Sequence, residues 1–238
     1  MLKQINVTVW NEQDVNQAAY PEGIHTAIAK FLNDSGKFHI VRTATLSQPD
    51  HGLQKDVLDD TDVLIWWAHC YHHMVSDEIV ARVQQRVLDG MGLIVLHSGH
   101  AAKVFSRLIG TRTDKLRWRE IGERERVWTI EPNHPIAAGI PEYIDIPETE
   151  LYGECFQIPP PDELIFISWY QGGDVFRSGC TFKRGFGKIF FFSPGHESFL
   201  IYDMPEIQRV IINAAEWACP ISYPVPQTGH SPEPLEKI

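Results

Sequence analysis

Histidines gather directly after runs of apolar residues in this sequence. Six of the eleven histidines follow three apolar runs, at 62–67, 93–96 and 188–193; they are His69, His72, His73, His97, His100 and His196. Imidazole binds metal ions, transfers protons near neutral pH and donates or accepts hydrogen bonds. The spacing is therefore compatible with three kinds of site: a metal site, an acid–base catalytic site, and a nucleophilic site at Ser98. Ser98 lies between His97 and His100.

The apolar runs predict strands buried on both faces of a sheet, and helical patterns separate them. Strands are expected at 5–10, 38–46, 62–67, 92–97, 164–170 and 188–193. Helices are expected to begin near Pro21, after Ser76, near Ala101 and at Pro205. This order predicts an α/β fold with a doubly wound, mostly parallel sheet. Ligands bind beyond the carboxyl ends of such strands, so the histidines are expected on one rim.

One domain is expected over residues 1–219, followed by a proline-rich C-terminal tail at 220–238. The stretch 116–130 mixes acidic and basic residues, which favours a solvated strand face. The four cysteines are widely spaced without a C-x-x-C pair, and free thiols are the expected state.

Ser98 does not fit a nucleophile turn. The G-x-S-x-G signature needs small residues two positions before and after the serine, and here these are Leu96 and His100. A hydrogen-bonding serine that faces the substrate is the favoured interpretation.

A divalent metal, with zinc first, suits the histidines. His69 and His72 are close enough to share an ion, and His97 is expected to complete the set. The spacing matches no specific zinc signature, so catalysis without metal stays open. His100 and His196 are the candidate acid–base residues, with Glu197 or Glu154 to orient or tune them.

Composition excludes several function classes. The formal net charge of −10 argues against nucleic-acid and membrane partners. No signal sequence or 18-residue apolar run occurs, which predicts a cytoplasmic protein. No G-x-G-x-x-G or P-loop sequence is present, so no nucleotide cofactor is expected.

An ordered series of short motifs resembles the ThuA-like, trehalose-utilisation family over nearly the whole chain, from Ile5 to Trp217. The motifs are WNE (10–12), YPEGIH (20–25), GMGLIVLHSGH (90–100), WRE (118–120), LYGE (151–154), FRSGC (176–180) and PGHE (194–197). The resemblance implies a flavodoxin-like sheet related to class I glutamine amidotransferases. It also implies a role in the use of trehalose and related disaccharides, alongside an oxidoreductase that makes keto-sugars. The amidotransferase cysteine is missing at the elbow, so glutamine hydrolysis is not expected.

A sugar substrate fits the polar rim. Substrate contacts are expected from Trp10, Asn11, Glu12, Ser98 and Arg177. The preferred hypothesis is a sugar enzyme, an isomerase or a hydrolase. The alternative is a non-catalytic sugar-binding or regulatory protein derived from the amidotransferase fold. The oligomeric state stays open, with a homo-oligomer as one expectation.

Overall fold

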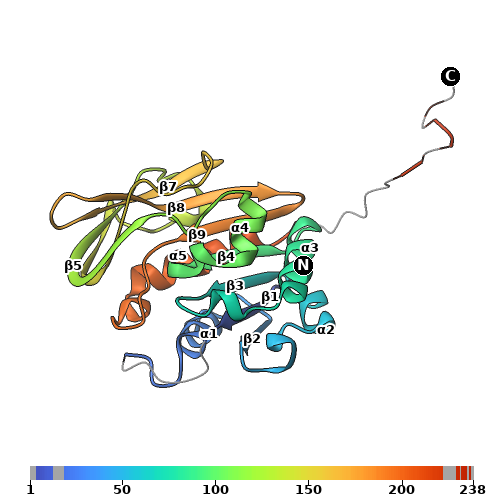
Figure 1. Ribbon diagram of the computed structural model, residues 1–238, viewed down its shortest axis with the longest axis horizontal. Helices are drawn as coiled ribbons and strands as arrows, with labels where there is room; N and C mark the ends of the chain where they lie inside the picture. Colours follow the sequence, from blue (N-terminus) through green and yellow to red (C-terminus); the bar gives the residue numbers. More distant parts are fainter. Residues whose placement is uncertain (1–3, 13–18, 222–228, 231, 235, 237–238) are drawn as a thin grey trace.

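The computed structural model describes residues 4–12, 19–221, 229–230, 232–234 and 236. Within them, nine strands form one sheet in the order β2-β1-β3-β4-β9-β8-β7-β5-β6 (Figure 1). The strands are β1 (Asn6–Asn11), β2 (Ile40–Thr45), β3 (Val63–Trp67), β4 (Gly92–Leu96), β5 (Arg117–Thr129), β6 (Tyr143–Gly153), β7 (Glu163–Tyr170), β8 (Val175–Arg184) and β9 (Gly187–Phe192). Most of the predicted tail, 220–238, lies outside the described residues.

The sheet is mixed, so the predicted mostly parallel, flavodoxin-like sheet is not confirmed. The five strands from β2 to β9 in the sheet order pair in parallel, whereas those from β9 to β6 pair antiparallel. Short turns explain the antiparallel half, because only antiparallel strands can be joined by a tight hairpin. Gly172 and Gly173 join β7 to β8 with φ of 110° and 100°. Strands β6 and β8 are missing from the sequence-based prediction.

Helices cover both faces of the parallel half. On one face α1 (Ile24–Asp34) and α5 (Pro205–Ala218) pack on Val63, Ile65 and Trp67 of β3. On the other, α3 (Asp77–Leu88) and α4 (Lys103–Ile109) pack on Leu64 and Trp66, and the short α2 (Lys55–Asp59) adjoins α3. Because neighbouring strand residues point to opposite faces, a continuous apolar run serves both layers. The predicted cap of α3 is confirmed, since the Ser76 side chain accepts a hydrogen bond from the Ile79 N–H.

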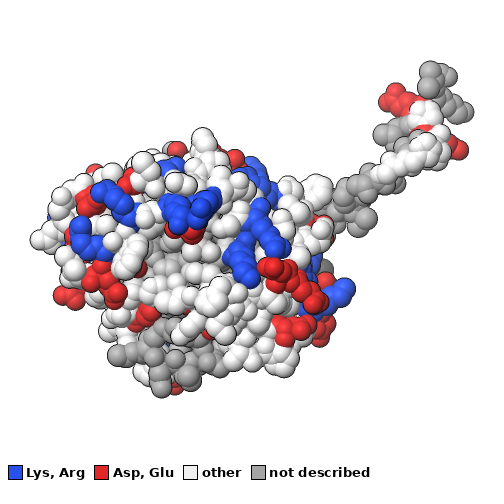
Figure 2. Space-filling model, in the orientation of Figure 1, with Lys and Arg blue, Asp and Glu red and all other residues white. Residues whose placement is uncertain are grey.

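The surface carries charges of both signs. On the face seen in Figure 2, basic and acidic side chains lie interspersed. Each helix in the described part of the chain is too short or too polar to cross a membrane.

Glu125 is a fully buried carboxyl group in β5. Its Oε1 accepts a hydrogen bond from the Ser168 hydroxyl, and its Oε2 has no hydrogen-bond partner among the described residues. Burial raises the pKa of Glu125 from 4.5 to about 7, because a charged carboxylate is poorly solvated there.

This raised pKa predicts that the contribution of Glu125 to stability falls as pH rises. The folded protein holds the Glu125 proton more tightly than the unfolded chain, so the stabilisation is complete below pH 4.5 and is lost as pH rises through about 7. Between pH 5 and pH 8 the free energy of urea unfolding of the wild type, taken relative to that of Glu125→Gln, should fall by about 2.5 kcal/mol, because the difference cancels the titration of the buried histidines. Exposed Glu142→Gln is the control and should keep the wild-type slope. Equal slopes in the wild type and Glu125→Gln would contradict the prediction.

Candidate functional site

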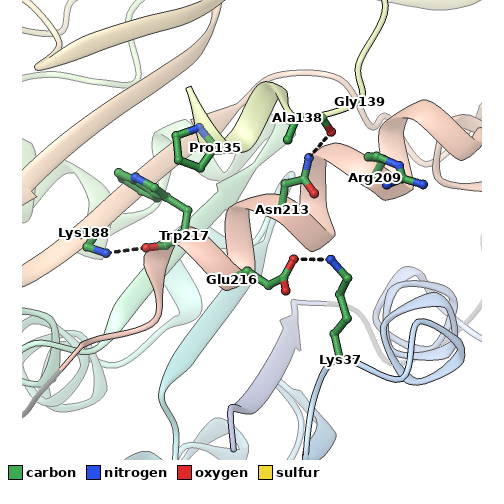
Figure 3. Close-up of a pocket in the computed structure, with 9 residues that line it drawn as sticks. All are labelled: Lys37, Pro135, Ala138, Gly139, Lys188, Arg209, Asn213, Glu216 and Trp217. Atoms are coloured by element: carbon green, nitrogen blue, oxygen red, sulfur yellow. Dashed lines mark hydrogen bonds and ion pairs between the residues drawn. The ribbon is translucent and has the colours of Figure 1, made fainter. Parts of the chain in front are cut away.

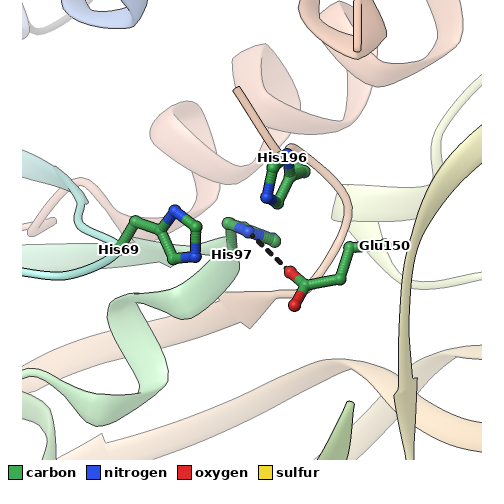
Figure 4. Close-up of side chains that lie close together, drawn as sticks. All are labelled: His69, His97, Glu150 and His196. Atoms are coloured by element: carbon green, nitrogen blue, oxygen red, sulfur yellow. Dashed lines mark ion pairs between the residues drawn. The ribbon is translucent and has the colours of Figure 1, made fainter. Parts of the chain in front are cut away.

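Three histidines and one glutamate meet at the carboxyl ends of β3, β4 and β9 (Figure 4). His69, His97, His196 and Glu150 each offer one metal-ligand atom, and these four atoms lie within 4.8 Å of one another. The His97 and His196 side chains are only 2% exposed. The ring of His196 lies 5.0 Å from that of His69 and 5.2 Å from that of His97. Because β3, β4 and β9 are parallel neighbours, the loops that follow them converge at one edge.

Glu150 reaches this edge from β6. Ile144 and Ile146 of β6 belong to the core under α1 and α5, whereas Leu151 and Tyr152 belong to the opposite core. Residues of β6 therefore face both cores, and Glu150 of this strand extends to His97 at the carboxyl end of β4. Its Oε2 is 3.2 Å from His97 Nε2 but forms no hydrogen bond within the described chain, so the two atoms are close without being aligned as donor and acceptor.

Neighbouring side chains fix the loops that carry the histidines. The buried Glu12 carboxylate accepts hydrogen bonds from the backbone N–H groups of Cys70 and Tyr71, which anchors the loop after β3. The Trp67 indole donates to the Gly195 carbonyl at 3.0 Å and joins this loop to the one after β9. The site is thus held by buried contacts between elements that are distant in sequence.

Electrostatics favours charged carboxylates beside the rings. Burial opposes ionisation of Glu197, but the hydrogen bond from His69, 2.6 Å long, lowers the pKa of Glu197 to about 2. Burial likewise lowers the pKa of His69, but Glu197 outweighs it and raises that pKa overall. Burial would raise the pKa of Glu150, yet the three neighbouring rings bring it below its ordinary value. Burial lowers the pKa of His196 to about 4, so this ring is neutral at neutral pH.

The sharp turn after β4 lies at His97, one residue before the predicted elbow serine. His97 has a φ of 51°, in the left-handed region, and begins the 3₁₀ turn η3 (His97–Ala101). A Cβ at Gly99 would lie 3.0 Å from Val95 Cγ1, so the turn packs tightly against the strand that precedes it. The Ser98 hydroxyl is buried and hydrogen-bonded to the Tyr152 hydroxyl. A histidine therefore occupies the strained position that a nucleophile elbow would use.

Most of the other residues predicted for the site lie outside the group of four, and three of them are His72, His100 and Trp10. His72 is half-buried in η2 (His72–Met74). His100 is buried against Tyr152 and Phe156 and donates from Nδ1 to the Thr113 carbonyl, and burial lowers its pKa to about 4. Trp10 is fully buried and stacks on Trp66 at 3.8 Å, which leaves no exposed ring face for a substrate.

Glu154 and Arg177 pair with each other and do not join the group of four. The Arg177 guanidinium donates to both carboxylate oxygens of Glu154, at 2.8 and 3.0 Å. Phe156 N–H donates to the same carboxylate at 2.7 Å, which holds the segment after β6. Although burial opposes it, the arginine lowers the pKa of Glu154. Asn11, also predicted for the rim, is buried, and its amide nitrogen lies 3.2 Å from His25 Nδ1.

Two cavities lie in different parts of the molecule, and one of them is lined by residues near the group of four in sequence. One, of about 650 Å³, lies along α5 beside Lys37 and Lys188, at the amino ends of the strands (Figure 3). Its polar groups are engaged with the protein, since Lys37 pairs with Glu216 and Lys188 donates to the Trp217 carbonyl. The other, of about 520 Å³, is lined by residues directly after Glu197 and by 145–148 of β6, the strand that carries Glu150. None of the four group residues lines this second cavity, although Ser198 on its wall lies two residues after His196.

Glu150 is the group member that sequence reasoning missed. It lies in YIDIPETELYG, where the alternation of Ile144 and Ile146 with polar residues is a strand signal that Pro147 interrupts. No apolar run precedes it, so the rule that located the histidines could not locate the carboxylate.

Similar structures come from several bacteria. A ThuA-like protein from Parabacteroides merdae is 16% identical and has a TM-score of 0.70, with 91% of this chain and 90% of that chain covered. A protein from Salmonella typhimurium, described as cytoplasmic, is 12% identical with a TM-score of 0.61, over 91% of this chain and 100% of its own. A β-galactosidase from Rahnella sp. R3 is 13% identical with a TM-score of 0.57, over 91% of this chain but 32% of its own. At these identities the likeness shows the fold alone.

Sequence comparisons give the family. Among curated proteins, no sequence matches this chain. The family model ThuA, described as trehalose utilisation, matches residues 6–218, which confirms the resemblance inferred from the motifs. The chain therefore belongs to the ThuA, trehalose-utilisation, family.

Proposed function

We propose that this protein is a metal-dependent enzyme of sugar metabolism that acts on trehalose-related or keto-sugars. The observation that carries the proposal is the convergence of three imidazoles and one carboxylate at the carboxyl ends of three strands, with ligand atoms within 4.8 Å of one another. We further propose a cytoplasmic location, which the description of a Salmonella protein of similar fold as cytoplasmic supports.

The chemistry of the group fits a divalent transition metal. Imidazole and carboxylate together suit zinc, and also iron or manganese. Glu150 Oε2 is buried and has no hydrogen-bond partner within the described chain, although such atoms are normally paired. The Glu197 carboxylate is hydrogen-bonded to His69 Nδ1, as carboxylates commonly are to the second ring nitrogen of metal-binding histidines.

The surroundings fit a polar substrate with an apolar face. Glu120 Oε1 lies 3.5 Å from His196 Nε2, and two residues earlier in β5 Trp118 exposes 67% of its surface. An exposed indole offers a flat apolar surface for a sugar ring, while Glu120 can accept hydrogen bonds from hydroxyl groups. The neighbouring cavity lined by Ser198 and Phe199 is the space that we propose for the rest of the substrate.

The proposed reaction is proton transfer beside a ketone or hemiacetal carbon, in an isomerisation or a hydrolysis. The metal, when bound, polarises the substrate oxygen. The protein's own contribution is to hold the oxygen in a largely buried site and to supply carboxylates that accept a proton. Keto-sugars arise by oxidation of a hydroxyl group, so a sugar oxidoreductase is the expected functional partner.

Metal analysis of protein purified without an affinity tag or chelator tests the proposal. We expect about one zinc, manganese or iron per chain, or binding of about one after incubation with these ions. Trehalose and its keto derivatives are then incubated with the loaded protein and the products are identified by mass spectrometry. Absence of metal under both conditions would refute the metal-dependent part. Sugar binding by calorimetry without any product would favour a non-catalytic sugar-binding protein.

A further inference from the structure

The hydrogen bonds behind two of the rings leave Nε2 of each ring as the atom nearer the group, and His97 Nε2 also lies 3.4 Å from the Tyr152 hydroxyl. His69 Nδ1 lies 2.6 Å from Glu197 Oε1, and His97 Nδ1 lies 3.1 Å from the Ser193 carbonyl oxygen. A carboxylate and a carbonyl only accept hydrogen bonds, so each Nδ1 carries the hydrogen. In the neutral rings Nε2 is then unprotonated, and this is the form in which histidine binds a metal.

His196 has the opposite arrangement. Its Nδ1 accepts a hydrogen bond from the Ser198 backbone N–H at 3.1 Å. A backbone N–H can only donate, so Nδ1 is unprotonated and the neutral ring carries its hydrogen on Nε2. This Nε2 is buried, and within the described residues it forms no hydrogen bond.

Among the described residues, no carboxylate oxygen lies closer than 3.5 Å to the hydrogen-bearing His196 Nε2. The nearest carboxylate oxygens, of Glu120 and Glu197, lie 3.5 and 3.8 Å from it. Ser198, which fixes the tautomer, lines the cavity beside the site, together with Phe199. The residue that fixes the His196 tautomer thus lies on the wall of the neighbouring cavity.

Resting on the proposed function, we infer that His196 is a hydrogen-bond donor to the substrate and not a metal ligand. His69, His97 and Glu150 form a two-histidine, one-carboxylate set that leaves coordination positions open. The Nε2–H of His196 donates to the carbonyl or hydroxyl oxygen of the sugar that enters those positions. The three rings thus have two different roles, which their Nδ1 partners assign.

Nitrogen NMR of the ¹⁵N-labelled wild-type protein tests the tautomers without any metal. Long-range proton–nitrogen correlations should show His196 protonated at Nε2, and His69 and His97 protonated at Nδ1. A His196 ring protonated at Nδ1 would overturn the inference, and this result does not depend on any variant folding.

Metal titration tests the roles with matched substitutions. Co²⁺ binding, followed by its visible absorption, is compared in the wild type, His69→Gln and His196→Gln. We expect His69→Gln to weaken binding by at least about 100-fold and His196→Gln to leave it within about threefold, with the Co²⁺ spectrum retained. Equal losses in both variants would overturn the inference while leaving the metal site intact as a proposal. A wild type that binds no Co²⁺ would instead refute the proposed function, and the nitrogen spectra would then decide the tautomer of His196.

Discussion

Glu150→Gln is expected to weaken divalent-metal binding by at least about 100-fold, since even residues that only support a metal ligand affect affinity 10- to 100-fold. The substitution keeps the shape of the side chain but removes its negative charge. In the folded protein the three neighbouring imidazoles hold the pKa of Glu150 below its ordinary value, although burial alone would raise it, so a carboxylate is present at neutral pH. A neutral amide beside His97 cannot supply this charge to a cation.

The measurement is a metal titration of both proteins by calorimetry or by competition with a chromophoric chelator. Glu148→Gln is the matched control, because Glu148 lies on the same strand but is exposed and is not part of the group. It should bind metal like the wild type. If Glu150→Gln bound metal with unchanged affinity, the carboxylate would not be a ligand and the proposed set would be wrong.

Gly195→Ala is expected to destabilise the protein by about 3–5 kcal/mol and to disturb the site. Gly195 has a φ of +134°, and a Cβ there would lie 2.0 Å from the Tyr202 hydroxyl oxygen. Overpacking costs about 1–3 kcal/mol and backbone strain a similar amount. Tyr202 is fully buried, so its ring has little freedom to move away. Because Gly195 directly precedes His196 and accepts the Trp67 hydrogen bond, a shift there moves His196 as well.

Gly173→Ala provides the control for Gly195→Ala. Gly173 also has a left-handed φ, of +100°, but an added Cβ meets no atom of the described structure within 4 Å. Only backbone strain remains, about 1–2 kcal/mol. Urea unfolding of both variants gives the difference, and Tyr202→Phe in the Gly195→Ala background should recover part of the loss by removing the hydroxyl. Equal destabilisation by the two alanines would show that the contact with Tyr202 does not matter.

The parallel half of the fold is readable from the sequence because its signals are local. Apolar runs such as 63–67 and 92–96 mark doubly buried strands, and Ser76 marks the start of α3. The antiparallel half has weaker signals. Strand β8, VFRSGCTFKR, contains a glycine and charged residues, and β6 contains a proline, so neither has the periodicity of a typical strand.

Some residues of the candidate site could likewise be predicted from the sequence, and others could not. The histidines could be located because each follows a recognisable strand, and the topology brings His69, His97 and His196 together. Which histidines converge could not be predicted, since His100 is turned into an aromatic pocket by its bond to Thr113. Glu154 and Glu150 are four residues apart, and only the tertiary pairing of Glu154 with Arg177 separates their surroundings. The roles of individual ring nitrogens depend on contacts such as that of Ser198, which leave no sequence signature.

The origin of Glu150 in β6 bears on which ion the proposed site would retain. The three histidines come from the ends of adjacent parallel strands, whereas the carboxylate comes from the last strand in the sheet order. Before β6 docks, the site would offer imidazole alone, and among divalent ions such nitrogen donors favour copper over zinc. Docking of β6 adds an oxygen donor and a negative charge, which suits zinc, iron or manganese. In the proposed site the full ligand set therefore exists only once β6 has paired with the sheet, so metal binding is expected to follow folding of the antiparallel half.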